Sequence, residues 1–308
     1  MAVCVIVAPV AFDLLGSRCV RHILTCFFGN VVTMARKNRE KNTDTTPTLA
    51  DGFTTVVGDV EFRLRVDNQR VTVFLDGLES SALNLVDASE LEFEYMQYMT
   101  CVLNAFYPVP APISALHLGA CACALPRAWH ALRPGSTQTA VDLNAPMLDL
   151  VRSLFDLPKS PALRLRHQDA CESLAGVKPG KFNVIVRDVF AQGVTPAPLR
   201  SPGFYEQAAN ALEAGGILLV NCGHGDGVDA REEVRYALEK FPQVRVIAEG
   251  KTLAGGRRGN VVLAARFPFA SEDATQTAAY WDEVSRGLRR LAFPARFLDE
   301  ADTKRWAK

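Results

Sequence analysis

The sequence predicts an α/β protein in which a small antiparallel β domain precedes a larger sheet covered by helices. Residues 114–142 read as a buried strand, a loop of small residues, a helix and a second strand that ends on Asp142, which is the order of a βαβ unit. Upstream, residues 60–66 and 71–75 alternate apolar and polar side chains, as strands with one buried face do. Near the end of the chain, a short glycine-rich connection precedes the last strand. Together these features predict both the fold class and the order of its parts.

The N-terminal region divides into an extension and the small β domain. Residues 1–46 are expected to be an extension that is disordered or comes from an upstream start site, because Met34 is followed at once by a polar, charged run. Apolar runs before it are interrupted by charges and are too short to span a bilayer, for which roughly 20 apolar residues are needed. Residues 47–108 are expected to form the antiparallel hairpins and an amphipathic helix at 90–106, followed by prolines at 108, 110 and 112.

Residues 109–270 are expected to form the main domain, with alternating strands and helices, and 271–308 a helical tail. A break between helix and strand is predicted at Gly215 and Gly216. The predicted strands cover 115–118, 138–141, 163–167, 182–187, 217–221, 244–248 and 260–266, and the helices that follow them include 146–155, 202–212 and 228–241.

The connection to the last strand decides between two kinds of α/β sheet. Residues 252–259 read T-L-A-G-G-R-R-G, which is too short for a crossover helix, so the last strand should be antiparallel to its neighbour. A seven-stranded sheet closed by such a hairpin is the methyltransferase-like Rossmann arrangement of S-adenosylmethionine-dependent transferases. Dinucleotide dehydrogenases continue with another βαβ half instead.

Candidate site residues follow the ends of the first four strands of the main domain. Gly119, Asp142, Asp169 and Asp188 occupy these positions, and ligands of open α/β sheets bind at the carboxyl ends of the strands. Asp142 is expected to bind the hydroxyls of a ribose, Asp169 the amino group of adenine, and Asp188 to take a proton from an attacking amine. The alternative for each acid is a helix N-cap, for which Asp is a favoured residue.

Other side chains carry less chemistry. The 34 basic and 34 acidic residues balance, so no bulk attraction to nucleic acid or to an anionic membrane is expected. The eight cysteines show no metal-ligand spacing, which predicts reduced thiols, no metal site and a cytoplasmic protein. His117 is expected to pack in the core, whereas His224, on a loop at a strand end, is the histidine worth testing for function.

The chain from about residue 71 to 266 resembles the spermidine/spermine synthases, the polyamine aminopropyltransferases, in a branch described as spermidine synthase-like. The resemblance rests on F-L-D-G at 74–77, E-F-E-Y at 92–95, H-L-G-A-C-A-C-A-L-P-R at 117–127, V-D-L-N at 141–144, D-A at 169–170, V-I-V-R-D-V-F at 184–190 and G-R-R-G-N at 256–260. It implies a homodimer that transfers an aminopropyl group from decarboxylated S-adenosylmethionine to an amine such as putrescine. It also implies that Asp188 is the general base and that Tyr95 positions the amine. The donor-binding residues would be Gly119, Ala120, Asp142, Asp169, Ala170 and Glu79.

The sequence departs from the family pattern where charged ligand groups bind. Ala122 stands in place of the acid that binds the donor amine, and Ala191 in place of the acid that anchors a diamine. Glu79 replaces a glutamine, and Leu253 a tyrosine, while Arg187, Arg257 and Arg258 stand nearby in sequence. Two alternatives therefore remain open: a methyltransferase that uses intact S-adenosylmethionine, and a non-catalytic homologue that binds a nucleoside cofactor or only a partner.

Overall fold

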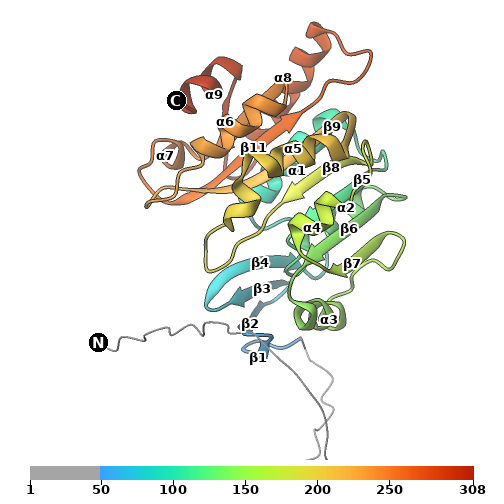
Figure 1. Cartoon of the computed structure of the whole chain (residues 1–308). Coiled ribbons are helices and arrows are strands. Elements are labelled where there is room, and N and C mark those ends of the chain that lie inside the picture. Colours follow the sequence, from blue (N-terminus) through green and yellow to red (C-terminus); the bar gives the residue numbers. More distant parts are fainter. Residues whose placement is uncertain (1–48) are drawn as a thin grey trace, which may run out of the picture. The chain divides into compact units, whose positions relative to one another are not determined.

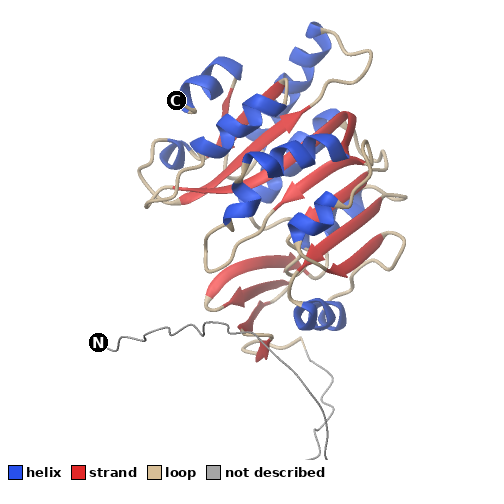
Figure 2. Cartoon of the chain, viewed as in Figure 1, coloured by secondary structure: helices blue, strands red, loops and turns tan. Residues whose placement is uncertain are grey.

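The computed structural model describes residues 49–308 (Figure 1), so the predicted extension at residues 1–46 lies outside the described residues. Residues 49–308 belong to one compact unit. Helices and strands alternate along most of it (Figure 2). In the described part of the chain no helix has the length and apolar character needed to cross a bilayer.

The small N-terminal sheet is antiparallel, as predicted. It has four strands in the order β1-β2-β3-β4: β1 (Thr54–Val57), β2 (Val60–Asp67), β3 (Arg70–Leu75) and β4 (Leu78–Asn84). Alternation along β2 buries Phe62 and Leu64, which places one face of the sheet in the core. Helix α1 (Glu94–Phe106) then leads into the main sheet; it begins four residues later than the predicted helix, because Phe93 is the N-cap.

The main sheet has eight strands in the order β12-β10-β11-β9-β8-β5-β6-β7. Figure 1 labels β11, β9, β8, β5, β6 and β7 of this sheet. Strands β5 to β9 pair in parallel, and β11 runs antiparallel between β9 and β10. This confirms the predicted methyltransferase-like fold class. The strands are β5 (Ser114–Leu118), β6 (Thr137–Asp142), β7 (Leu163–His167), β8 (Phe182–Arg187), β9 (Leu212–His224), β10 (Gln243–Ala248), β11 (Gly259–Arg266) and β12 (Arg296–Leu298).

Strand β12 adds an eighth strand to the predicted seven. It lies in the segment expected to be a helical tail and pairs antiparallel with β10, Phe297 opposite Ile247. Three residues are too few for a period-two pattern to stand out in the sequence. The helices are α2 (Ala124–Leu132), α3 (Ala145–Leu154), α4 (Ala170–Ala175), η1 (a 3₁₀ turn, Ala197–Arg200), α5 (Pro202–Ala211), α6 (Arg231–Lys240), α7 (Gly250–Leu253), α8 (Ala274–Arg290) and α9 (Glu300–Trp306).

Two apolar cores lie on opposite faces of the main sheet because strand side chains alternate in direction. On β5, Ala115 belongs to the core beneath α1, α2, α3 and α8, whereas Leu116 belongs to the core beneath α4, α5, α6 and α9. Burial on both faces explains why the central strands are almost continuously apolar.

The predicted break at Gly215 and Gly216 is wrong. Both glycines lie inside the 13-residue strand β9. Gly215 has φ +81°, and the ring of Phe269 occupies the space where a Cβ would lie. The glycine pair therefore lets a strand bend beneath an aromatic ring rather than ending a helix.

Hydrogen bonds join the N-terminal sheet to helix α2 and to the loop that follows β6. Arg127 Nη1, on α2, donates to the carbonyl of Asn84 at 2.7 Å, and Asn144 Nδ2 donates to the carbonyl of Val57 at 2.9 Å. The small sheet thus forms one side of the region where the candidate residues lie.

Candidate active site

Asp142, at the end of β6, holds the small-residue loop that follows β5. Its Oδ2 accepts hydrogen bonds from the backbone N–H groups of Ala120 at 3.1 Å and Cys121 at 3.4 Å, and its Oδ1 accepts one from Asn144 N at 3.0 Å. The N-cap of α3 is Asn144 rather than Asp142. The N-cap alternative for Asp142 is therefore wrong, and its carboxylate faces the loop predicted to bind the donor.

Gly119 opens this loop and has φ +91°, a conformation that residues with a side chain rarely adopt. A Cβ at this position would lie 2.1 Å from the carbonyl oxygen of Asp188. Asp188 N in turn donates to the carbonyl of Leu118 at 2.8 Å. The ends of β5 and β8 therefore touch through their backbones, and only glycine fits between them.

Asp188 is held by two side chains from other elements. Tyr95 Oη, on α1, donates to Oδ2 at 2.7 Å, and Asn221 Nδ2, on β9, donates to Oδ1 at 3.0 Å. Burial raises the pKa of the Asp188 carboxyl above its ordinary value, and the two hydrogen bonds oppose that rise. Burial, followed by the negative charge of Asp188, raises the pKa of Tyr95 well above its ordinary value. The tyrosine is therefore a neutral donor to a carboxylate of raised basicity.

Asn221 is a candidate residue that the sequence did not reveal. Its side chain is buried at 2% exposure near the end of the apolar strand β9. The available signal was a polar residue in L-L-V-N-C at the carboxyl end of a strand beside that of Asp188. A polar side chain in an otherwise apolar strand is informative because it must be satisfied by a partner when buried.

The thiol of Cys121 lies close enough to Asp142 and Asp188 for both charges to act on it. Burial raises the pKa of its thiol most strongly, and the negative charge of Asp142, followed more weakly by that of Asp188, raises it further. Cys121 also contributes to the raised pKa of Tyr95. Ala122, next in the chain, is fully buried and belongs to the apolar core.

Asp169 performs the alternative role considered for it. Its Oδ1 accepts hydrogen bonds from Cys171 N at 2.8 Å and Glu172 N at 3.0 Å, and so it caps α4. Ala170 is buried at the first turn of that helix. The two residues follow β7, whose neighbour in the sheet is β6, but Asp169 is not part of the hydrogen-bond network around Asp188.

The arginines near the site in sequence are occupied by internal partners. Arg187 is fully buried, and its side chain points to the other side of the sheet from that of Asp188, the next residue. It forms an ion pair with Glu233 and donates hydrogen bonds to the carbonyls of Leu199 and Asn221. Arg257 forms an ion pair with Glu249, and Arg258 Nη2 donates to the carbonyl of Gly193. Sequence proximity alone therefore misplaces Arg187, because adjacent strand residues point to opposite faces.

Two further residues singled out from the sequence have contacts of their own. Glu79, on β4, accepts from Arg65 Nη2 at 3.0 Å with about half of its side chain exposed. Ala191 is exposed in the loop after β8, where its backbone pairs with Val194.

The two histidines considered from the sequence, His117 and His224, both have structural roles. His117 Nε2 lies 2.9 Å from Gln138 Oε1, and burial lowers its pKa to about 4, which confirms the predicted core position. His224 is also buried: its Nδ1 accepts from Ala230 N at 3.2 Å, and its ring packs against Trp306. His224 was expected on a loop at a strand end, but it is the last residue of β9 and is covered by Trp306 of α9.

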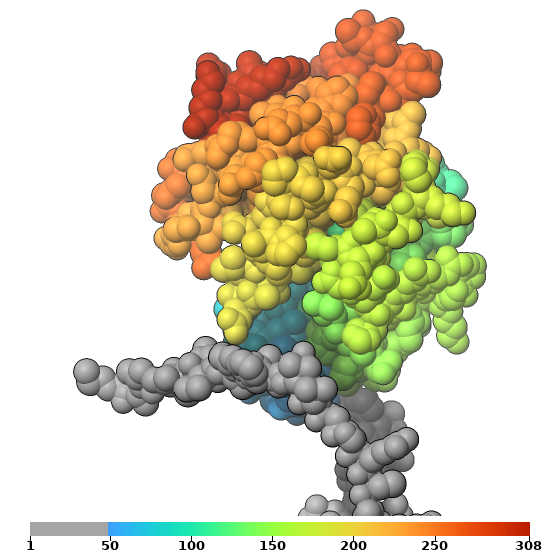
Figure 3. Space-filling view, viewed as in Figure 1, coloured from blue at the N-terminus to red at the C-terminus, as the bar shows by residue number. Residues whose placement is uncertain are grey.

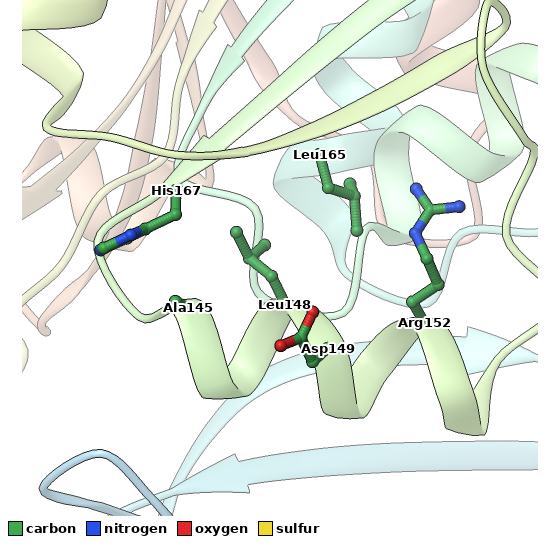
Figure 4. A pocket seen from close by; sticks show the side chains of 6 residues that line it. All are labelled: Ala145, Leu148, Asp149, Arg152, Leu165 and His167. Carbon is green, nitrogen blue, oxygen red and sulfur yellow. The ribbon is translucent and has the colours of Figure 1, made fainter.

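A separate pocket of about 270 Å³ lies between α3 and β7, with Arg152 and His167 toward its two ends and Leu148 and Leu165 between them (Figure 4). Ala145 and Asp149 complete its lining. Asp142 and Asp188 do not line it, so the candidate site is defined by the hydrogen-bonded cluster around Asp188 and by the loop held by Asp142.

Known proteins share sequence and fold with this chain. No family model matches the chain. Curated polyamine aminopropyltransferases from two strains of Neisseria meningitidis are 28% identical over 147 residues, which cover 47% of this chain and 55% of theirs. The chain thus spans about half the length of these curated relatives.

Solved structures cover more of the chain. Human methyltransferase-like protein 13 in complex with SAH (20% identity, TM-score 0.52, 65% of this chain and 94% of that one) shares the fold. So does a spermidine synthase in complex with the transition-state analogue AdoDATO (14%, 0.51, 83% of each chain). A probable spermidine synthase from Corynebacterium glutamicum is 30% identical, with a TM-score of 0.74 over 84% of this chain and 94% of that one. The chain belongs to the spermidine synthase family.

Proposed function

We propose that this protein is an aminopropyltransferase that transfers an aminopropyl group from decarboxylated S-adenosylmethionine to an amine, for which putrescine is the reference substrate. The observation that carries the proposal is the Asp188 carboxylate, held by Tyr95 and Asn221 and touching the loop at Gly119. A carboxylate fixed in this way, with a raised pKa, suits proton abstraction from an amine.

Binding of the donor is assigned to the loop and strand ends on the other side of Gly119. Asp142 would accept from the ribose hydroxyls, and the Gly119–Ala120 segment would let the nucleoside approach the backbone closely. Asp169 and Ala170, which follow β7, would lie against the adenine. Two structural relatives bound to SAH and to AdoDATO support an adenosyl ligand for this fold.

The transfer step needs a neutral amine nitrogen, because an ammonium has no free electron pair. Asp188 would take a proton from the bound ammonium, and Tyr95 would hold the carboxylate in place. The nitrogen lone pair then forms a bond to the aminopropyl carbon as the carbon–sulfur bond breaks, and sulfur keeps that electron pair. The products are the substituted amine and the neutral thioether, methylthioadenosine. The raised pKa of Asp188 favours proton uptake.

Methyl transfer from intact S-adenosylmethionine is the second candidate, and one observation favours it. Ala122 is fully buried, so no carboxylate at that position binds the donor ammonium or repels the donor carboxylate. One charge-assisted contact is worth about 1.5–3 kcal/mol, which is about tenfold to a hundredfold in donor preference. Donor choice is therefore a measurable consequence of this substitution.

Calorimetric titration with decarboxylated S-adenosylmethionine, the intact form and methylthioadenosine tests these assignments. We expect decarboxylated donor and methylthioadenosine to bind, and product assays to show aminopropyl transfer. A preference for the intact form with methylated product would support the second candidate. Absence of heat with all three compounds would contradict both and favour a non-catalytic homologue.

The variant Asp188→Asn tests the role of the proposed base independently of donor binding. We expect turnover to fall by at least about a hundredfold, in line with loss of a general base, with little change in nucleoside affinity. Asp282→Asn, on the exposed face of α8, is the matched control and should leave both unchanged. Full turnover in Asp188→Asn would remove Asp188 from the mechanism.

Assembly and location remain part of this proposal. We expect a homodimer that acts in the cytoplasm on a small-molecule amine. Sedimentation equilibrium of the purified chain tests the first expectation, and a monomer at micromolar concentration would contradict it.

A further inference from the structure

The amide of Asn221 has one atom without a partner beside Asp188. Asn221 Nδ2 must be the atom that faces Asp188 Oδ1, because an ionised carboxylate only accepts hydrogen bonds. Its Oδ1 is buried and has no hydrogen-bond partner among residues 49–308. A buried acceptor without a partner is unfavourable, and an N–H group of a ligand bound next to Asp188 would satisfy it.

The loop after Asp188 carries no charged residue. Residues 189–195 read V-F-A-Q-G-V-T, and Phe190 and Val194 are 38% and 42% exposed. The Phe190 ring lies 4.0 Å from the position that a Cβ of Gly223 would take. Gly223 follows Asn221 by two residues on β9, so this exposed ring lies over the strand end that carries the unpartnered amide oxygen.

Contacts from two other parts of the chain place the loop. Arg258 donates to the carbonyl of Gly193, and Leu78, 54% exposed on β4, approaches the same glycine. Figure 3 shows the loop region, in yellow, at the surface beside the blue N-terminal sheet. Glu79, which follows Leu78 on β4, is paired with Arg65, and Glu249 is paired with Arg257. The loop beside Asp188 therefore presents the apolar side chains of Phe190 and Val194 and no carboxylate of its own.

We propose that the acceptor is a primary amine with an apolar body rather than a diamine. The nitrogen donates one hydrogen bond to Asn221 Oδ1 and gives a proton to Asp188, while the apolar body lies against Phe190 and Val194. This inference rests on the proposed transfer to an amine and names the acceptor class of the same site. The atom balance is that given above: the nitrogen–carbon bond forms, the carbon–sulfur bond breaks, and the proton goes to Asp188.

Pentylamine and putrescine form a matched pair, because a methyl group in the first replaces the second amino group of the other. We expect kcat/KM for pentylamine to exceed that for putrescine by about tenfold or more, since a second ammonium would be desolvated against the apolar side chains of Phe190 and Val194. A preference for putrescine would overturn the proposal. Ala191→Asp, which adds a carboxylate to the loop, should raise kcat/KM for putrescine relative to that for pentylamine by about tenfold to a hundredfold.

Asn221→Ala tests the role of the amide. We expect a rise of about tenfold or more in KM for pentylamine with unchanged affinity for methylthioadenosine. The acidic limb of the kcat/KM profile should also move to higher pH, because Asp188 loses a hydrogen bond that lowers its pKa. A purely structural asparagine would leave both the acceptor KM and the limb unmoved, which would overturn its assignment. Asn210→Ala, exposed on α5, is the control.

Binding alone gives a second readout. With methylthioadenosine bound to the wild type, calorimetric titration with pentylamine and with putrescine should show the same preference, and Asn221→Ala should weaken pentylamine. If methylthioadenosine binds but putrescine is preferred, only this inference fails. If methylthioadenosine does not bind, the proposed function fails and this inference with it.

Discussion

The hydroxyl of Tyr95 donates a 2.7 Å hydrogen bond to Asp188 Oδ2, across 93 residues of sequence. One partner lies on the helix that leads out of the small sheet and the other at the end of a central strand of the main sheet. The position of the proposed base therefore depends on how α1 packs. Met99, Val102 and Leu103, fully buried on that helix, fix it in the core.

Tyr95→Phe removes the hydroxyl and keeps the packing. The hydrogen bond from Tyr95 lowers the pKa of Asp188, so its loss should raise that pKa further. Because a base must be ionised to accept a proton, the acidic limb of kcat/KM should move to higher pH and turnover should fall about tenfold or more. Tyr236→Phe, on α6, where the lost hydroxyl donates only to Glu232, is the control. An unmoved limb would show that Tyr95 does not act through Asp188.

Asp142→Ala should weaken methylthioadenosine binding by about tenfold or more. It removes the proposed ribose ligand and leaves the N–H groups of Ala120, Cys121 and Asn144 without their acceptor. Asp142→Asn keeps an accepting oxygen and should bind with intermediate affinity. Calorimetry measures both, and equal dissociation constants for wild type and Asp142→Ala would exclude the nucleoside role.

Asp169 allows the helix cap to be separated from a ligand role. Asn is as good an N-cap as Asp, so Asp169→Asn should keep the free energy of unfolding within a few tenths of a kcal/mol, whereas Asp169→Ala should cost about 0.5–2 kcal/mol. If Asp169 also binds adenine, Asp169→Asn should weaken methylthioadenosine despite intact stability. Unchanged affinity in Asp169→Asn would leave only the cap.

Arg187 and Glu233 form a buried ion pair in which each side chain compensates the charge of the other. Arg187→Ala leaves a buried carboxylate unpaired and should cost about 3–5 kcal/mol of unfolding free energy. The double variant Arg187→Met, Glu233→Leu should recover more than half of that loss, because no charge stays buried. Urea denaturation tests this. Equal stability of the single and double variants would argue against the pair.

His117 gives a pH dependence of stability. Burial lowers its pKa from 6.5 to about 4, so the unfolded chain binds the proton more readily between these values. The free energy of unfolding should therefore fall as pH drops from 6.5 to 4, by up to roughly 3 kcal/mol from this group. His117→Asn should show a shallower decline over that range. Parallel curves for the two proteins would contradict a buried, neutral histidine.

The order of elements followed from local patterns, because period-two strands, helix repeats and glycine turns are written in adjacent residues. The antiparallel last strand was predictable from residues 252–259, since chain length alone forbids a crossover helix there. Strand β12 was not, because its pairing with β10 depends on a distant segment. The break predicted at Gly215 was wrong for the same reason. A glycine allows unusual backbone conformations, but the conformation found here depends on the ring of Phe269, which is distant in sequence.

The candidate site residues also divide into those that local sequence predicts and those that depend on tertiary packing. Asp142 and Asp188 were found by their place after strands. The capping role of Asp169 was foreseen as an alternative, but the local sequence does not decide between cap and ligand. Asn221 and the covering of His224 by α9 depend on tertiary neighbours, which no local pattern records.

The close approach of Gly119 to Asp188 leaves no room for a side chain at position 119. An alanine there would place its Cβ 2.1 Å from the carbonyl oxygen of Asp188, so the backbone at one of the two strand ends would have to move. Because Asp188 is the proposed base, a substitution at residue 119 should disturb the direction of a carboxylate that belongs to a different strand.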